Sequence, residues 1–115
     1  MSHPAETGAP IPIPVTEQLP DLKVGTSAIA VTGVIDKCTV GILEKHVARA
    51  LGRQPRVLVI DLTGVRFLSA AGVWALIQAR AIAYEQSCEV YLRGVRPNVH
   101  MVLRAQGVDG LFPRI

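Results

Sequence analysis

The chain has 115 residues, half of them hydrophobic, and a formal net charge of +3, which fits a single domain with one ordinary core. No apolar run approaches the roughly 20 residues that cross a bilayer, and the N-terminus lacks the basic-then-apolar order of a signal peptide, so we expect a cytoplasmic protein with no membrane partner. Its basic residues are scattered rather than clustered, which argues against a nucleic-acid partner.

The N-terminal segment is rich in proline. In residues 10–14 prolines alternate with isoleucines, a pattern that removes backbone donors and favours an extended polyproline conformation. We predict a flexible arm over residues 1–20, followed by one domain over residues 21–115. Two interpretations of the arm stay open: it is a plain tail, or its apolar residues lie against the domain or against a second copy in a homodimer.

The domain is expected to begin with two short strands, residues 22–24 and 28–31, which pair as an antiparallel hairpin at the edge of the sheet. A helix should follow, because Asp36 stands where an N-cap is expected and Gly52 where the helix should stop. Between them, apolar residues recur at three- and four-residue steps and predict a stripe that packs on the sheet: Val40, Leu43, Val47 and Leu51.

Cys38 follows the expected cap by two residues. In the first turn of a helix the dipole favours the thiolate, so this cysteine is a candidate redox site. The alternative is a small, half-buried thiol with no role, because the sequence shows no base or second cysteine beside it.

A buried strand and a helix meet in the middle of the chain. Residues 57–60 form an unbroken apolar run rich in β-branched residues, which is typical of a strand covered by helices on both faces. We expect residues 62–68 to cross from this strand to a helix capped by Ser69. After the cap, Ala70, Ala71 and Gly72 leave the first-turn amides almost uncovered, so this helix start favours contact with an anion or with a partner's carbonyl group.

The second helix, expected over residues 70–86, separates its faces. Its apolar side is predicted to hold Val73, Leu76, Ile77 and Tyr84. Trp74 falls on the other side, one turn ahead of Gln78 and close to the bare first turn. An exposed tryptophan at such a place is typical of an interface; the alternative is that the loop at Pro97 or the N-terminal arm covers it.

The remaining elements complete an alternating pattern. A strand is expected at residues 90–92, a helix that Pro97 opens and Gly107 closes, and a last short strand at residues 111–112. Alternating strands and helices predict a single α/β domain with a mostly parallel sheet of four to five strands, an antiparallel edge strand and flanking helices.

No catalytic constellation is visible in the sequence. The two cysteines and three histidines show no metal-ligand spacing, so we expect no metal and no cofactor. Asp36 and Asp61 are the only acids in suggestive places, and a cap or a turn explains each of them. We therefore expect a binding protein rather than an enzyme.

Three motifs together resemble a known family. The signatures of the STAS-domain anti-sigma-factor antagonists of bacteria are similar to three segments of this chain. These are Asp61-Leu62-Thr63 at a strand end, Ser69-Ala70-Ala71-Gly72 at a helix start, and Gly33-Val34-Ile35-Asp36 followed by Thr39 and Leu43. The segment from Val95 to Phe112 also resembles the end of that domain.

The resemblance implies a function in transcription regulation by partner switching. Such a protein binds an anti-sigma factor with a histidine-kinase-like ATPase fold and frees a sigma factor, and the implied contact residues are Asp36, the residues from Ser69 to Gly72, Trp74 and Gln78. The family's phosphorylated serine corresponds to Ala70, which has no hydroxyl group. Two interpretations follow: phosphorylation has moved to Ser69 or Thr63, or Ser69 serves only as the helix N-cap. The alternative function is a non-phosphorylated STAS module that senses a small anion or nucleotide or serves as a scaffold.

Overall fold

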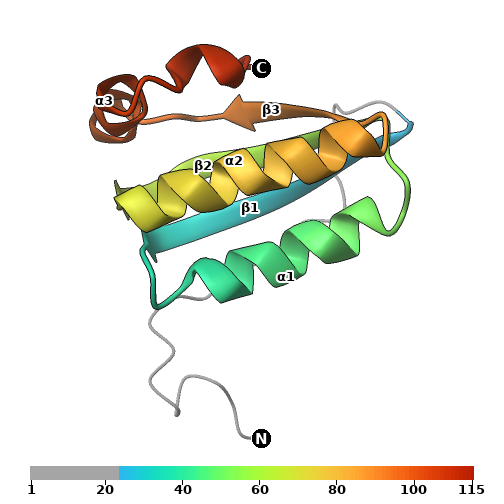
Figure 1. Cartoon of the computed structure of the whole chain (residues 1–115), viewed down its shortest axis with the longest axis horizontal. Coiled ribbons are helices and arrows are strands. Elements are labelled where there is room, and N and C mark those ends of the chain that lie inside the picture. The colour runs from blue at the N-terminus through green and yellow to red at the C-terminus, as the bar shows by residue number, and fades with distance from the viewer. Residues whose placement is uncertain (1–23) are drawn as a thin grey trace, which may run out of the picture.

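The computed structural model describes residues 24–115, which form a sheet with helices packed against it (Figure 1). The elements follow in the order β1 (Thr26–Ile35), α1 (Val40–Leu51), β2 (Val57–Leu68), α2 (Ala70–Glu85), β3 (Glu89–Arg93), α3 (Pro97–Ala105) and the 3-10 turn η2 (Asp109–Leu111). The predicted arm and most of the predicted strand at residues 22–24 lie outside the described residues; Val24 itself lies in a turn.

The described strands form one parallel sheet in the order β1-β2-β3. Thr26 pairs with Val57, and Val57 pairs with Glu89, so the first residues of the strands share one end of the sheet. Parallel neighbours require crossover connections, and α1 and α2 supply them. The predicted α/β domain with a parallel sheet is confirmed, although the described part of the sheet has three strands rather than four or five.

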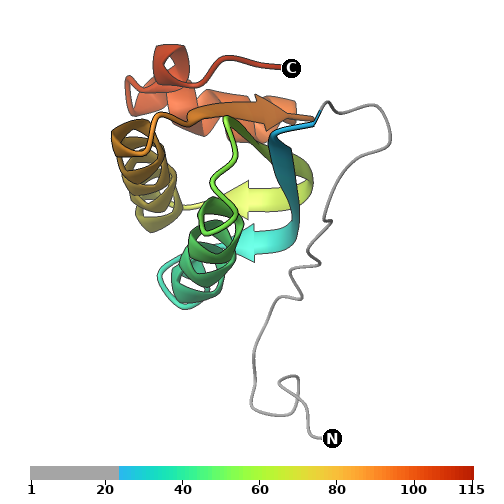
Figure 2. The ribbon, with the colours of Figure 1, turned by 90° about the vertical axis from the view of Figure 1, so that its right-hand side faces the viewer.

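Helices α1 and α2 lie side by side on one face of the sheet (Figures 1 and 2). The expectation of helices on both faces is therefore not met within residues 24–115. The predicted stripe of α1 is confirmed, because Leu43, Val47 and Leu51 are buried and Val40 packs at the margin of the core. Small residues dominate the buried side of α2, which lets this helix approach the sheet closely: Gly72, Ala75, Ala79 and Ala83.

Both long strands extend beyond their predicted ends. Residues 62–68 were expected to form a connection, but they belong to β2 and pair with β1 as far as Ile35 and Leu68. Strand β1 continues past Gly33 because this glycine takes a φ of 89° at an irregularity in the register, a conformation that costs glycine little. The two strand ends therefore reach the start of α2 together.

Helix α3 lies beside β2 beyond the end of β3. Strand β3 pairs with β2 only as far as Asp61. Further along, Arg96 Nε donates to the carbonyl oxygen of Thr63 (2.6 Å) and Asn98 Nδ2 donates to that of Arg66 (2.6 Å). Side chains at the start of α3 thus satisfy carbonyl groups of β2 that have no neighbouring strand there.

The C-terminal residues differ from the prediction. The strand expected at residues 111–112 is wrong, because Leu111 ends η2 and Phe112 is buried in the core. A single parallel bridge forms slightly later: Leu92 N donates to the carbonyl oxygen of Pro113, and Ile115 N donates to that of Leu92 (both 3.0 Å). These backbone bonds place the last residues beside β3.

Candidate functional site

The start of α2 is fixed directly to the end of β1. The backbone amide of Ser69 donates to the carbonyl oxygen of Ile35 (2.9 Å). The Ser69 hydroxyl accepts a hydrogen bond from the amide of Gly72 (3.2 Å), which confirms the predicted N-cap. Asp36 follows Ile35, so two segments that are distant in sequence meet at this point. We call Asp36 together with residues 69–72 the docking turn.

Gly72 makes this close approach possible. A Cβ atom at this position would lie 2.5 Å from Leu68 Cδ1, 2.9 Å from Ile35 Cγ2 and 2.9 Å from the Ile35 carbonyl oxygen. All three distances are shorter than a normal contact, so only glycine fits without movement of a neighbour. Gly72 is buried, and its part in the docking turn is to let the helix pack against the strand.

The prediction that Asp36 is the N-cap of the first helix is wrong. Thr39 holds the cap position, and the helix begins at Val40. Asp36 instead closes a tight turn in which its Oδ1 accepts from the amide of Cys38 (2.9 Å). Thr39 is 1% exposed. Its hydroxyl group accepts a hydrogen bond from the amide of Asp36 and donates one to the carbonyl oxygen of Val34 (both 3.0 Å).

Cys38 lies in this turn, before the helix rather than in its first turn. The argument that the helix dipole favours its thiolate therefore loses its geometric basis. The side chain is exposed, not half-buried, and it is a free thiol. Its redox role remains only a prediction.

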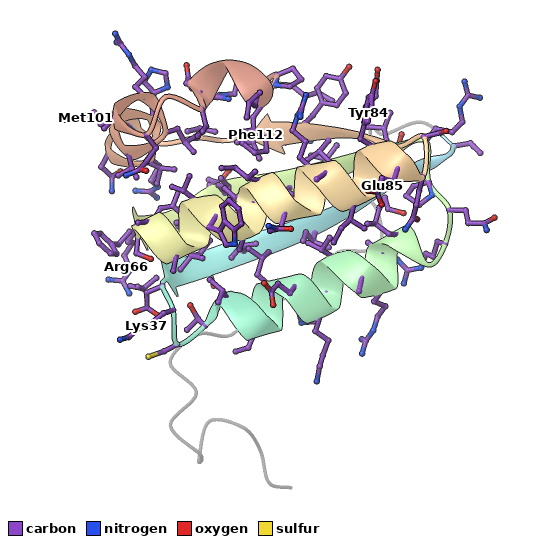
Figure 3. All side chains as sticks on the ribbon, in the orientation of Figure 1. Lys37, Arg66, Tyr84, Glu85, Met101 and Phe112 are labelled. Atoms are coloured by element: carbon purple, nitrogen blue, oxygen red, sulfur yellow. The ribbon has the colours of Figure 1, made fainter. Side chains whose placement is uncertain are left out.

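The first turn of α2 is open to solvent. Ala70 is exposed and Ala71 is partly exposed, whereas Gly72 is buried. Lys37 and Arg66, both exposed, lie at the same end of the domain as the start of α2 (Figure 3). The electrostatic potential at this surface combines the partial positive charge of the helix end with these two cations.

Sequence reasoning missed three exposed residues around the docking turn. Lys37 follows Asp36 directly, Arg66 lies three residues before Ser69, and Phe67, two residues before Ser69, is 51% exposed. Residues 62–68 were assigned to a connection, so the alternation of sides along β2 was not applied to them. In that alternation Phe67 falls opposite the buried Leu68, a signal that could have identified it.

Trp74 and Gln78 lie one and two turns along α2 from the docking turn. Trp74 is 60% exposed, as its place in the sequence pattern predicted, so the Pro97 segment does not bury it, and the alternative of cover by the N-terminal arm lies outside the described residues. Both residues line a groove of about 450 Å³ between α1 and α2. The predicted position of Tyr84 on the apolar side is wrong, because it is 74% exposed near the opposite end of α2 (Figure 3).

Thr63 lies apart from the docking turn. It is separated from Leu68 by five positions of β2, about 16 Å at the usual rise of a strand. Its amide donates to Asp61 Oδ1 (2.9 Å), and a Cβ atom on Gly94 would come within 1.9 Å of its hydroxyl oxygen. The structure therefore brings Asp36, Ser69, Ala70, Ala71 and Gly72 together with Trp74 nearby, but not Thr63.

The groups with shifted pKa values do not point to catalysis at this surface. Burial, with the nearby Glu89 carboxylate, raises the pKa of the Cys88 thiol, and burial together with neighbouring cations of α1 lowers the pKa of His46. Neither residue belongs to the docking turn.

Within residues 24–115 no cluster of three or more His, Cys, Asp or Glu side chains could hold a metal ion. None of the described helices has the length and hydropathy to span a membrane.

Comparisons with known proteins identify relatives of this domain. The model of the family described as "Mlab, STAS domain" matches residues 20–113. An anti-sigma factor antagonist from Mycobacterium paratuberculosis is 27% identical, with a TM-score of 0.72 over 90% of this chain and 84% of that one. An anti-sigma-factor antagonist (STAS) domain protein from Planctomyces limnophilus is 25% identical, with a TM-score of 0.71 over 90% and 87%.

A transporter domain shares the fold at lower identity. The STAS domain of a SulP transporter from Vibrio cholerae is 20% identical, with a TM-score of 0.62 over 78% of this chain and 70% of that one. A search of curated proteins gave no match.

Proposed function

Because the chain belongs to the STAS-domain family, we propose that it is an anti-sigma-factor antagonist of a bacterial partner-switching system. It binds an anti-sigma factor with a histidine-kinase-like ATPase fold in the cytoplasm and thereby releases a sigma factor. The chain catalyses no reaction, and ATP and magnesium belong to the partner. The two antagonists that are at least 25% identical support this assignment over a transporter domain.

The observation that carries the proposal is the exposed docking turn with Trp74 beside it. Ala70 and Ala71 present backbone amides without bulky side chains, so a partner's backbone can approach closely. Trp74, 60% exposed on the same helix, and Gln78 extend this surface along α2. A large aromatic side chain next to unsatisfied donors is the composition of an interface hot spot.

Ala70 changes how such an interface is regulated. It is exposed at the first position of α2, where a kinase could reach a hydroxyl group, but it offers none. Of the two candidate replacements, Ser69 lies in the docking turn and Thr63 does not. A phosphate on Ser69 would add nearly two negative charges at the contact surface, which opposes binding by repulsion and desolvation.

The first test is to mix the full chain with the ATPase-type anti-sigma factor of its own genome, with and without ATP and magnesium, and to record complex formation and intact mass. A complex that dissociates as one phosphate appears on Ser69 or Thr63 establishes a relocated switch. A stable complex with no added mass establishes an antagonist without this control. The absence of any complex contradicts the proposal and favours the anion-sensing or scaffold function.

Changing Trp74 to Ala should weaken this complex by more than about 1 kcal/mol, or roughly fivefold in Kd, because the substitution removes a central aromatic contact. The matched control is Tyr84→Ala, which removes an aromatic side chain that is 74% exposed near the other end of the same helix. Isothermal titration calorimetry measures both variants, and circular dichroism checks their folding. Equal affinities for the two variants would remove Trp74 from the interface.

A further inference from the structure

The groove between α1 and α2 is an apolar surface with polar groups at its rim. Buried Leu43 and Val47 form part of its floor, while Trp74 and Ile82 stand at its edge, 60% and 47% exposed. Gln78 also lines it, half-buried. Two large exposed apolar side chains on one groove favour an occupant that covers them.

The chain carries a segment whose chemistry fits this groove. Residues 10–15 read Pro-Ile-Pro-Ile-Pro-Val, so half of them lack a backbone N–H, while all of them retain a carbonyl acceptor. Proline segments of this kind bind to grooves lined by aromatic side chains. The prolines pack against the aromatic rings, and hydrogen-bond donors of the groove meet the carbonyl groups of the segment. Trp74 supplies a ring and an indole N–H, and Gln78 supplies amide donors.

The connection between this segment and the domain permits the contact. The described chain begins at Val24, and the Gly25 carbonyl oxygen accepts from the amide of Arg56 (2.8 Å), just after the end of α1. Leu51, the last residue of α1, lines the groove at that end. Eight residues lie between positions 15 and 24, and the nine steps from one position to the other span up to about 30 Å when extended.

We propose that residues 10–15 bind in the groove between α1 and α2 of their own chain, with Val15 toward Leu51 and Pro10 toward Trp74. The direction follows from the attachment point, because the chain enters the groove at the Leu51 end. A short tether also gives the segment a high effective concentration at the groove, which favours it over the same segment of a second copy. Bound there, it covers Trp74 and competes with any partner that uses this residue.

The test uses the fluorescence of Trp74, the single tryptophan of the chain. The full chain is compared with variants that lack residues 1–9 and residues 1–15. We expect the longer deletion to shift the emission to longer wavelength and to raise the acrylamide quenching constant, whereas the shorter deletion leaves both unchanged. Identical spectra and quenching for the full chain and the longer deletion would overturn the proposal.

Point variants and a peptide separate docking from a change in folding. The double substitution Ile11→Ser and Ile13→Ser should reproduce the longer deletion, and Thr7→Ser, outside the segment, should not. A peptide of residues 8–16 added to the chain that lacks residues 1–15 should restore the blue-shifted emission. Emission that depends on protein concentration, together with a doubled mass in solution, would instead show that the segment binds to a second copy and overturn the intrachain contact.

The fluorescence test is independent of the proposed function because it requires no anti-sigma factor. If a complex with the anti-sigma factor forms, deletion of residues 1–15 should tighten it, since the competing segment is gone. Unchanged affinity alongside a shift in emission would show that the segment covers Trp74 without competing, which contradicts that part of the inference.

Discussion

Substituting Gly72 with Ala tests how closely the docking turn is packed. The new Cβ would lie 2.5 Å from Leu68 Cδ1 and 2.9 Å from both Ile35 Cγ2 and the Ile35 carbonyl oxygen. Leu68 and Ile35 are each 1% exposed, so neither side chain has free space to move into. Overpacking of this kind costs about 1–3 kcal/mol, and the better helix propensity of alanine offsets about 1 kcal/mol of it. We expect a net loss of up to about 2 kcal/mol.

Gly41→Ala is the matched control for this substitution. Gly41 also lies in the first turn of a helix, but a Cβ atom there would meet nothing within 4 Å. This variant should gain about 0.5–1 kcal/mol from the loss of chain entropy in the unfolded state. Urea unfolding of both variants, with unchanged m-values, gives the comparison. A Gly72→Ala variant that gains as much stability as Gly41→Ala would refute the packing argument.

Three further substitutions test the local structure by urea unfolding. Ser69→Ala should lower the free energy of unfolding by about 1 kcal/mol, because the Gly72 amide loses its cap acceptor, and Ser69→Asp should restore the loss. Thr39→Val should cost about 1–3 kcal/mol, since two partly buried backbone groups lose their partner; a loss below this range would mean that water replaces the hydroxyl. Burial chiefly lowers the pKa of His46, so the unfolded state binds more protons and stability should fall as the pH drops through 6.5; His46→Gln should flatten this dependence.

The elements that the sequence predicted well are those with a local signal. The apolar repeat from Val40 to Leu51 predicted α1, Pro97 marked the first residue of α3, and Ser69 marked the cap of α2. Each signal depends on residues within one or two turns of chain. The same holds for the exposed position of Trp74, which followed from helical spacing alone.

The errors occurred where distant contacts decide the structure. Residues 62–68 continue as a strand because β1 also continues and pairs with them. The length of each strand depends on its partner, so the local sequence of neither strand predicts it. Thr39 replaces Asp36 as the cap because its hydroxyl is held by the carbonyl group of Val34 in the preceding strand. The sequence pattern places Tyr84 on the core side because α2 is apolar nearly all round, but toward that end of the helix the small residues Ala79 and Ala83 are the buried ones.

The parallel pairing of the strands has a consequence for how the chain folds. Each strand pairs with a partner about thirty residues away in the sequence, because a crossover helix lies between them. The next strand can therefore align only after the chain of that helix is present. No hairpin between the described strands can form early as a local nucleus. During synthesis, β1 therefore has no described strand to pair with until the ribosome has released β2, and the last bridge to Leu92 forms only when the C-terminal residues emerge.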